Sequence, residues 1–307
     1  MSILVFGHKN PDTDTICSAI AYAELKGKLG KDVKAVRLGE VNEETKFVLD
    51  YFKVEKPELI ESVSGKEIML VDHNERTQTA DGFEEAKVLE LVDHHRISNF
   101  NVDEPLYVRM EPVGCTATII LKLFKENNFL PSPTTAGLML SAIVSDTLLF
   151  KSPTCTECDV KAGKELAEIA GVNVEEYGLE MLKAGTALGG KSEAELINMD
   201  MKIFEVDGSK IGVAQVNTVN EAELLERKEK LLVEINNIIK KEGLKFFIFA
   251  ITNILSNDST GIVAGDGNAV IEKAFNEKID NNLIALKGVV SRKKQIIPPL
   301  TKAIQEA

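Results

Sequence analysis

The first half of the chain alternates short apolar runs with longer helical patterns, and this alternation limits the fold more than any other feature. Strand-like runs cover residues 3–6, 33–38, 68–71 and 88–92. Helical patterns cover residues 16–29, 44–52, 115–127 and 134–149, and two shorter ones follow up to about residue 187. Strands that alternate with helices form a mostly parallel sheet with helices on its faces. We therefore predict an α/β fold for this half.

A second series of strands and helices follows Gly189-Gly190-Lys191-Ser192, a small polar segment that is typical of a linker. Residues 201–206 and 211–216 predict a hairpin around Asp207-Gly208. The series continues with a helix at 221–241, strands at 246–254 and 261–264, and a helix at 269–275. Because 307 residues exceed the usual size of one domain, we predict two domains. The expected boundaries are an N-terminal domain at 1–187, a linker at 188–194 and a smaller C-terminal α/β domain at 195–307.

The composition argues against several classes of protein. A formal net charge of -12 repels polyanions, and the aromatic residues that stack on bases make up only 6% of the chain. We therefore expect no nucleic-acid partner. No apolar run approaches the roughly 20 residues of a membrane span, so we expect no membrane partner and a cytoplasmic protein. Cys155 and Cys158 form a CxxC without the second pair that a zinc site needs, and a reduced pair on a surface turn is the favoured interpretation.

All four histidines follow the ends of strand-like runs. His8 follows the run at 3–6, His73 follows the run at 68–71, and the pair His94-His95 follows the run at 88–92. Open α/β sheets bind their ligands at the carboxyl ends of the strands. Three strand ends that carry every histidine therefore predict one shared site.

Aspartates accompany the histidines in the same turns. The three segments read Gly7-His8-Lys9-Asn10-Pro11-Asp12-Thr13-Asp14, then Asp72-His73-Asn74, then Asp93-His94-His95. Asp146 adds a carboxylate inside an apolar helix, where burial costs several kcal/mol unless the group is hydrogen-bonded or binds a metal. A set so rich in oxygen suits Mn²⁺, Co²⁺ or Mg²⁺ better than structural zinc. Two such ions can generate a nucleophile at neutral pH and hold both oxygens of a phosphoryl transfer.

A compact basic cluster, Arg292-Lys293-Lys294, stands near the C-terminus of this acidic chain, after the strand-like Gly288-Val289-Val290. Taken alone, such a cluster is usually a surface turn. Beside a metal site that receives an anionic substrate, it predicts a clamp on phosphate groups.

These motifs together resemble those of a known family. Gly7-His8-x-x-Pro11-Asp12-x-Asp14, Asp72-His73-Asn74 and Asp93-His94-His95 resemble the motifs of the DHH phosphoesterase superfamily, and Ser291-Arg292-Lys293-Lys294-Gln295 resembles the signature of its family II (manganese-dependent) inorganic pyrophosphatases. The resemblance implies that His8 and Asp12 hold one metal ion. Asp14, His94 and Asp146 would hold a second, and Asp72 would bridge the two.

The same resemblance implies the reaction and the partners. A hydroxide that bridges two Mn²⁺ ions, or Co²⁺ ions in their place, would attack a pyrophosphate that carries Mg²⁺ and release two phosphates. His95, Lys202, Arg292 and Lys293 would contact the substrate, with Asp72, His95, Arg292 and Lys293 acting in catalysis, while Asp93 would orient an imidazole. The active site would lie between the two domains, and the protein would be a homodimer.

Three alternatives remain open on the sequence. An exopolyphosphatase or a short-oligonucleotide phosphodiesterase of the same superfamily would use the same metal site. The oligonucleotide branch typically carries a C-terminal Gly-Gly-Gly-His motif, and this chain has no histidine after His95. A non-catalytic protein that binds metal or phosphate is the third alternative, although pure binding does not require a complete two-metal set.

Overall fold

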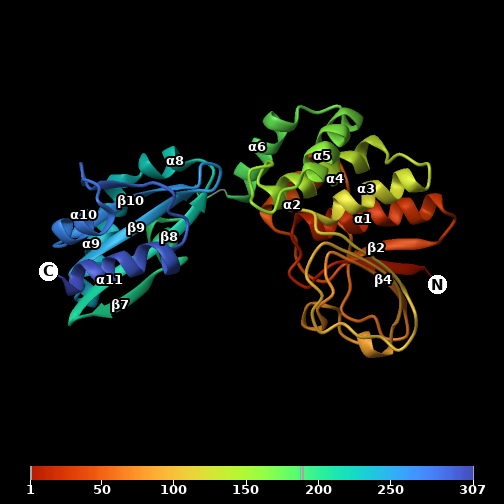
Figure 1. Ribbon diagram of the computed structural model, residues 1–307, viewed down its shortest axis with the longest axis horizontal. Helices are drawn as coiled ribbons and strands as arrows, with labels where there is room; N and C mark the ends of the chain where they lie inside the picture. The colour runs from red at the N-terminus through yellow and green to blue at the C-terminus, as the bar shows by residue number, and fades with distance from the viewer. Residues whose placement is uncertain (1, 187, 189, 307) are drawn as a thin grey trace. The chain divides into compact units, whose positions relative to one another are not determined.

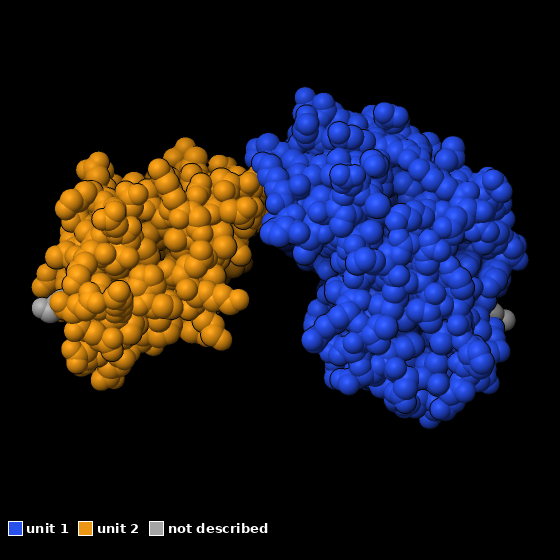
Figure 2. Space-filling view, viewed as in Figure 1, with its two compact units in different colours: residues 1–185 blue, residues 186–307 orange. Residues whose placement is uncertain are grey.

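The computed structural model describes residues 2–186, 188 and 190–306. The chain divides into two compact units, Met1–Gly185 and Thr186–Ala307, which Figure 2 colours separately. Ala187 and Gly189, at the predicted domain boundary and linker, lie outside the described residues. Leu188 is buried in the core of the second unit, and helix α7 (Glu193–Asn198) of that unit begins inside the predicted linker. The linker boundaries at 188–194 stay a prediction.

The first unit contains a six-stranded sheet in which every pairing is parallel. Its strands are β1 (Ile3–Phe6), β2 (Val33–Arg37), β3 (Glu58–Leu59), β4 (Glu67–Val71), β5 (Lys87–Asp93) and β6 (Tyr107–Met110). Their order is β3-β2-β1-β4-β5-β6. The chain builds outward from β1 in one direction and then returns to add β4 on the other side. The carboxyl ends of β1 and β4 therefore flank the switch point at which such sheets bind ligands.

Six α-helices accompany this sheet in the described part of the unit, and Figure 1 shows them gathered on one side of it. They are α1 (Thr13–Lys28), α2 (Glu43–Tyr51), α3 (Thr116–Glu126), α4 (Pro133–Thr147), α5 (Glu157–Ala170) and α6 (Val174–Gly185), with short 3₁₀ turns η1 (Arg76–Gln78) and η2 (Phe83–Glu85). Helix α4 begins at the cap Ser132 with Pro133 in its first turn, and it is buried along nearly its whole length between α1 and α5.

The second unit contains a five-stranded mixed sheet in the order β11-β10-β9-β8-β7. Its strands are β7 (Lys202–Val206), β8 (Ser209–Thr218), β9 (Phe246–Asn253), β10 (Asp258–Gly265) and β11 (Leu283–Leu286). Only β8 and β9 pair in parallel. The helices are α7, α8 (Glu221–Leu225), α9 (Lys228–Glu242), α10 (Asn268–Phe275) and α11 (Ile297–Gln305), preceded by the π-helical turn η3 (Arg292–Ile296).

Most predicted elements are confirmed to within three residues at each end, and two predictions in the second unit are wrong. The helix predicted at 221–241 is two helices, α8 and α9, because the chain turns at Arg227, whose side chain donates to the backbone oxygen of Lys191 and to Glu193. Residues 288–290 form no strand: β11 ends at Leu286, and Gly288 takes a left-handed conformation with φ 68°. The predicted hairpin is confirmed, with Asp207 and Gly208 both at positive φ. Among the described residues, no helix is long and apolar enough to cross a membrane.

Candidate metal centre

The carboxyl ends of three adjacent strands bring the predicted histidines and aspartates to one place. His8 follows β1, Asp72 follows β4, and Asp93 ends β5 just before His94 and His95. These strands are neighbours in the order β1-β4-β5. The amino end of α1 supplies Asp12 and Asp14, and the carboxyl end of α4 supplies Asp146.

Asp72 stands at the centre of the cluster. Its Oδ2 lies 3.6 Å from His8 Nε2, and its Oδ1 lies 3.5 Å from His94 Nε2 and 3.7 Å from His95 Nδ1. Among the described residues, three groups of side chains place their ligand atoms within 4.8 Å of one another, and Asp72 belongs to two of them. The groups are Asp72–His94–His95, His8–Asp12–Asp72 and Asp14–Cys115–Asp146. A carboxylate between two such groups can bridge two cations, which is the role that the family resemblance implies for Asp72.

The backbone and two threonines fix the Asp72 carboxylate. Asp72 has φ 58°, a left-handed conformation that aspartate tolerates better than most residues, and it turns the chain out of β4. Thr15 Oγ1 donates to Oδ2 at 2.7 Å, and Thr116 Oγ1 donates to Oδ1 at 3.1 Å. With its side chain only 1% exposed, the carboxylate is held at one position between α1 and α3.

The carboxylates of Asp12 and Asp14 are held by the helix ends around them. Asp12 caps α1, accepting a hydrogen bond from the backbone N–H of Thr15 at 2.9 Å. Asp14 accepts from Ser18 Oγ at 2.5 Å and from the backbone N–H of Thr116 at 2.8 Å. A side chain of α1 and the first backbone N–H of α3 therefore both donate to the Asp14 carboxylate and hold it in place.

Asp146 is positioned by an unusual turn at the end of α4. Leu148, Leu149 and Phe150 have consecutive positive φ values of 48°, 54° and 65°. Each such residue costs on the order of 1–3 kcal/mol, so packing must compensate for the turn. The side chains of this turn pack closely against two glycines. A Cβ added at Gly178 would lie 2.6 Å from the Leu149 side chain, and one added at Gly163 would lie 2.6 Å from the Phe150 side chain. The Oδ2 atom of Asp146 is buried without a hydrogen bond, and a buried carboxylate oxygen without a partner fits a role as a metal ligand.

We expect Gly163→Ala to weaken the metal centre although it lies outside it. The new methyl group would displace Phe150, loosen the left-handed turn and shift Asp146, at a cost of about 1–3 kcal/mol in the free energy of unfolding. Gly27→Ala, in the exposed last turn of α1 where an added Cβ meets nothing within 4 Å, is the matched control and should be neutral or slightly stabilising. Chemical denaturation and Mn²⁺ titration of both variants test this, and equal effects at the two glycines would contradict it.

Hydrogen bonds select which ring nitrogen each histidine presents. His94 Nδ1 lies 3.0 Å from the backbone oxygen of Val113, which leaves Nε2 facing Asp72 and Asp146. Asp93 accepts from the ring of His95 at 2.9 Å, which confirms the predicted role in orienting an imidazole. His73 points its Nδ1 at the backbone oxygen of Val71, and burial lowers its pKa to about 4. It is a neutral side chain outside the three ligand groups of the described residues, so the four histidines do not all join the cluster.

Crowding of carboxylates makes the cluster a strong attractant for cations. Burial, with the charge of Asp14, raises the pKa of Asp72 to about 7. Burial and the charge of Asp14 also raise the pKa of Asp146 well above its usual value. For His94, burial lowers the pKa, but the interactions with Asp72 and Asp14 outweigh it and raise the pKa to about 9. A raised pKa favours the protonated form of each group, and divalent ions that replace those protons would stabilise the site.

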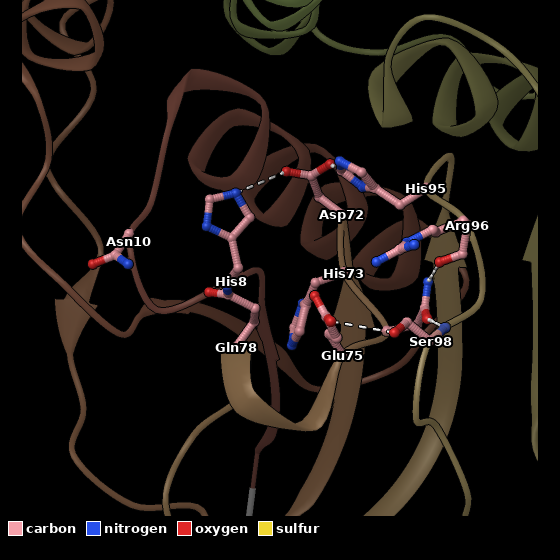
Figure 3. A pocket seen from close by; sticks show the side chains of 10 residues that line it. His8, Asn10, Asp72, His73, Glu75, Gln78, His95, Arg96 and Ser98 are labelled. Atoms are coloured by element: carbon pink, nitrogen blue, oxygen red, sulfur yellow. Dashed lines mark hydrogen bonds and ion pairs between the residues drawn. The ribbon is translucent and has the colours of Figure 1, made fainter. Parts of the chain in front are cut away.

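Two cavities meet at the cluster. One, shown in Figure 3, has a volume of about 320 Å³ and is lined by His8, Asp72, His95 and Arg96 among others. The other has a volume of about 360 Å³ and is lined by Asp12, His94, Asp146 and the backbone around Gly114. Asp72 and His95 line both cavities. The candidate ligands are therefore reachable from solvent on two sides.

The predicted phosphate contacts Lys202, Arg292 and Lys293 all lie in the second unit. Arg292 Nη1 forms an ion pair with Asp200 at 2.8 Å, and its backbone N–H donates to Gln215 in β8. Lys202 begins β7 two residues after Asp200, so the structure places Arg292 beside the segment that leads into Lys202. Lys202 and Lys293 are exposed. Their contact with substrate stays a prediction.

The fold and the cluster define a class of protein. A parallel α/β sheet carries, at its switch point, a set of imidazoles and carboxylates whose central aspartate can bridge two divalent ions. Oxygen and nitrogen donors in this ratio suit Mn²⁺, Co²⁺ or Mg²⁺. Paired ions of this kind serve hydrolysis of phosphate bonds.

Comparison with known proteins narrows this class. Residues 2–143 match the N-terminal domain of the DHH family, and residues 179–303 match the DHHA2 domain. A protein of Exiguobacterium sp., named probable manganese-dependent inorganic pyrophosphatase, is 59% identical over 98% of each chain. A Bacillus cereus protein with the same name is 56% identical over 99% of each chain. A solved family II inorganic pyrophosphatase of Methanococcus jannaschii is 44% identical, covers 99% of this chain and 100% of its own, and superposes with a TM-score of 0.63. The chain belongs to the family of manganese-dependent, or family II, inorganic pyrophosphatases.

Sequence reasoning missed the residues that hold the ligands in place. Thr15, Ser18 and Thr116 donate to Asp14 or Asp72 from positions that read as ordinary helix residues. Glu44 accepts from Thr13 at 2.7 Å and Ser145 at 2.5 Å, which ties the start of α1 to the end of α4. Polar residues at buried helical positions are the only signal that the sequence offered for them.

Proposed function

We propose that this chain hydrolyses pyrophosphate to two phosphates at a two-metal site in its first unit. The observation that carries this proposal is Asp72, a buried carboxylate whose two oxygens face separate ligand groups, one with His8 and one with His94. The family membership supports the substrate, because the similar proteins from Exiguobacterium and Bacillus cereus are named inorganic pyrophosphatases.

The proposed ligands divide into two sets around Asp72. His8 and Asp12 would hold one ion, and Asp14, His94 and Asp146 would hold the other. The names of the relatives support manganese, and the donor set fits Co²⁺ equally well. When bound, two such cations supply the positive charge that activates water for attack on phosphorus and neutralises phosphate oxygens.

The chain's own residues bind and orient around that charge. Val113 and Asp93 hold the rings of His94 and His95 through backbone and carboxylate oxygens. His95, half-exposed between the two cavities, is placed to contact a phosphate oxygen. His95 donates from its ring to the Asp93 carboxylate, and this hydrogen bond raises the pKa of His95, which favours the protonated imidazole that can donate to an anionic substrate.

The remaining parts of the proposal concern the second unit and the assembly. Arg292, Lys293 and Lys202 would bind the phosphates of a pyrophosphate that arrives with Mg²⁺. We also propose that the protein is a cytoplasmic homodimer. The acidic net charge supports a small metal-bound anion as the substrate in place of nucleic acid.

Metal reloading tests the reaction directly. The chelator-stripped protein, reloaded with Mn²⁺, Co²⁺, Zn²⁺ or Mg²⁺ alone, should release phosphate from pyrophosphate fastest with Mn²⁺ or Co²⁺. Tripolyphosphate, ATP and a short oligonucleotide serve as parallel substrates and should be cleaved far more slowly. Cleavage of the oligonucleotide without activity on pyrophosphate would move the chain to the phosphodiesterase branch, and binding without turnover of any substrate would make it a binding protein.

A further inference from the structure

The cavity in Figure 3 contains a cation that the predicted site does not use. Arg96 follows His95 directly and lines the cavity of about 320 Å³ together with His8 and Asp72. Its side chain is exposed, and its guanidinium makes no ion pair or hydrogen bond within the described part of the chain. Figure 3 shows the guanidinium directed into the cavity, toward His73 and His95.

The backbone that carries Arg96 is fixed although its side chain is free. Asn74, buried after β4, donates from Nδ2 to the backbone oxygen of Arg96 at 2.9 Å and accepts from the backbone N–H of Ser98 at 2.7 Å. The same amide donates to Asp93 at 2.6 Å, and Asp93 also accepts from the backbone N–H of His95 at 3.0 Å. A loop held on both sides of Arg96 positions the start of its side chain and leaves its charged end available for a ligand.

The charge of the metal centre indicates which kind of ligand Arg96 would bind. The four candidate carboxylate ligands carry four negative charges when ionised; they are Asp12, Asp14, Asp72 and Asp146. Two divalent cations neutralise these charges and leave no net positive charge at the site. A diphosphate therefore needs further positive charge beside the metal centre. Most of the other polar groups of this cavity, such as those of Asn10 and Gln78, are uncharged, and Glu75 accepts a hydrogen bond from Ser98. Arginine is the side chain best shaped to bind phosphate through two parallel hydrogen bonds.

We propose that Arg96 is a substrate-binding residue of the first unit, which contacts a phosphate group of pyrophosphate in the cavity beside the metal centre. This inference rests on the proposed function. Because Asp72 and His95 line both this cavity and its neighbour, a diphosphate held at the metals can extend one phosphate toward Arg96. The residue adds a phosphate contact from the unit that carries the metals to those predicted from the second unit.

The test compares Arg96→Gln and Arg96→Lys with Lys66→Gln. Lys66 is an exposed lysine of the same unit whose side chain forms no ion pair within the described residues, so its replacement removes one charge without touching the cavity. With the Mn²⁺-loaded protein, Arg96→Gln should raise KM for pyrophosphate and weaken the binding of imidodiphosphate, a non-hydrolysable probe, by about 10- to 100-fold. Arg96→Lys should recover part of this loss, and Lys66→Gln should resemble the wild type.

The affinity for Mn²⁺, measured by electron paramagnetic resonance without substrate, shows whether Arg96 binds the substrate or only supports the structure of the metal centre. It should be unchanged in Arg96→Gln, and a fall that accounts for the loss of activity would overturn the proposal. Unchanged KM and unchanged probe binding in Arg96→Gln would also overturn it while leaving the pyrophosphatase proposal intact. Absence of activity on pyrophosphate in the wild-type protein would instead contradict the proposed function itself.

Discussion

Replacement of Asp72 by asparagine is expected to remove nearly all phosphate release from pyrophosphate, by on the order of 10³-fold or more. Asparagine has almost the same shape, but it lacks the negative charge that the proposed bridging role of Asp72 requires. The two oxygens of Asp72 lie between ligand groups, one at 3.6 Å from His8 and the other at 3.5 Å from His94. The affinity for Mn²⁺ should fall by at least 100-fold. This loss is larger than the one produced by removing a residue that only hydrogen-bonds to a metal ligand.

Asp50→Asn is the matched control for this variant. Asp50 is exposed in the last turn of α2, and its side chain forms no ion pair within the described residues. Calorimetric titration with Mn²⁺ and single-turnover assays should show wild-type behaviour for Asp50→Asn. They should show almost no Mn²⁺ binding and almost no phosphate release for Asp72→Asn. Full Mn²⁺ affinity in Asp72→Asn would falsify the bridging role. The metal-free Asp72→Asn protein should fold as stably as the wild type or more so, because the substitution removes a buried charge among other carboxylates.

Removal of the metals is expected to destabilise the protein by an amount that grows with pH. Asp72 has a folded pKa of about 7, above its unfolded value, so the folded metal-free state binds more protons between about pH 4 and 7 and loses stability as pH rises through that window. His94, with a folded pKa of about 9, contributes stability that is fully present below its unfolded value near 6.5 and is lost as pH rises toward 9. Both groups therefore act in the same direction.

Cations reverse this loss because they bind the deprotonated ligands. Ligand excess of about 1,000 times Kd adds about 4 kcal/mol of stability for each site, so the Mn²⁺-loaded protein should melt on the order of 10 °C or more above the metal-free protein at pH 8. Scanning calorimetry from pH 5 to 9, with and without chelator, measures the difference. It should widen steadily with pH, and Asp72→Asn should flatten the metal-free curve between pH 5 and 7. A difference that shrinks with rising pH would contradict the assignment of these groups as ligands.

The sequence by itself determined the elements that depend on local pattern. Apolar runs such as Ile3–Phe6 and helices such as that over 134–149 follow from the spacing of their own residues, and they are confirmed as β1 and α4. The placement of His8, Asp72 and His94 at strand ends also follows locally, since parallel strands end at the same edge of a sheet. Short or exposed elements carry no such pattern, and so β3 with two residues and the half-exposed β6 were missed.

Only the tertiary structure decided which polar groups meet. Thr116 donates to Asp14 across 102 residues of sequence, and Asn74 holds the backbone of Arg96 from the neighbouring strand end. The left-handed turn after Asp146 persists because glycines in α5 and α6 make room for it. Such contacts depend on how helices and strands pack, and the side chains that make them read as ordinary polar residues along the chain. The residue types of the candidate site could therefore be predicted from the sequence, while the hydrogen bonds that hold these side chains in place depend on the fold.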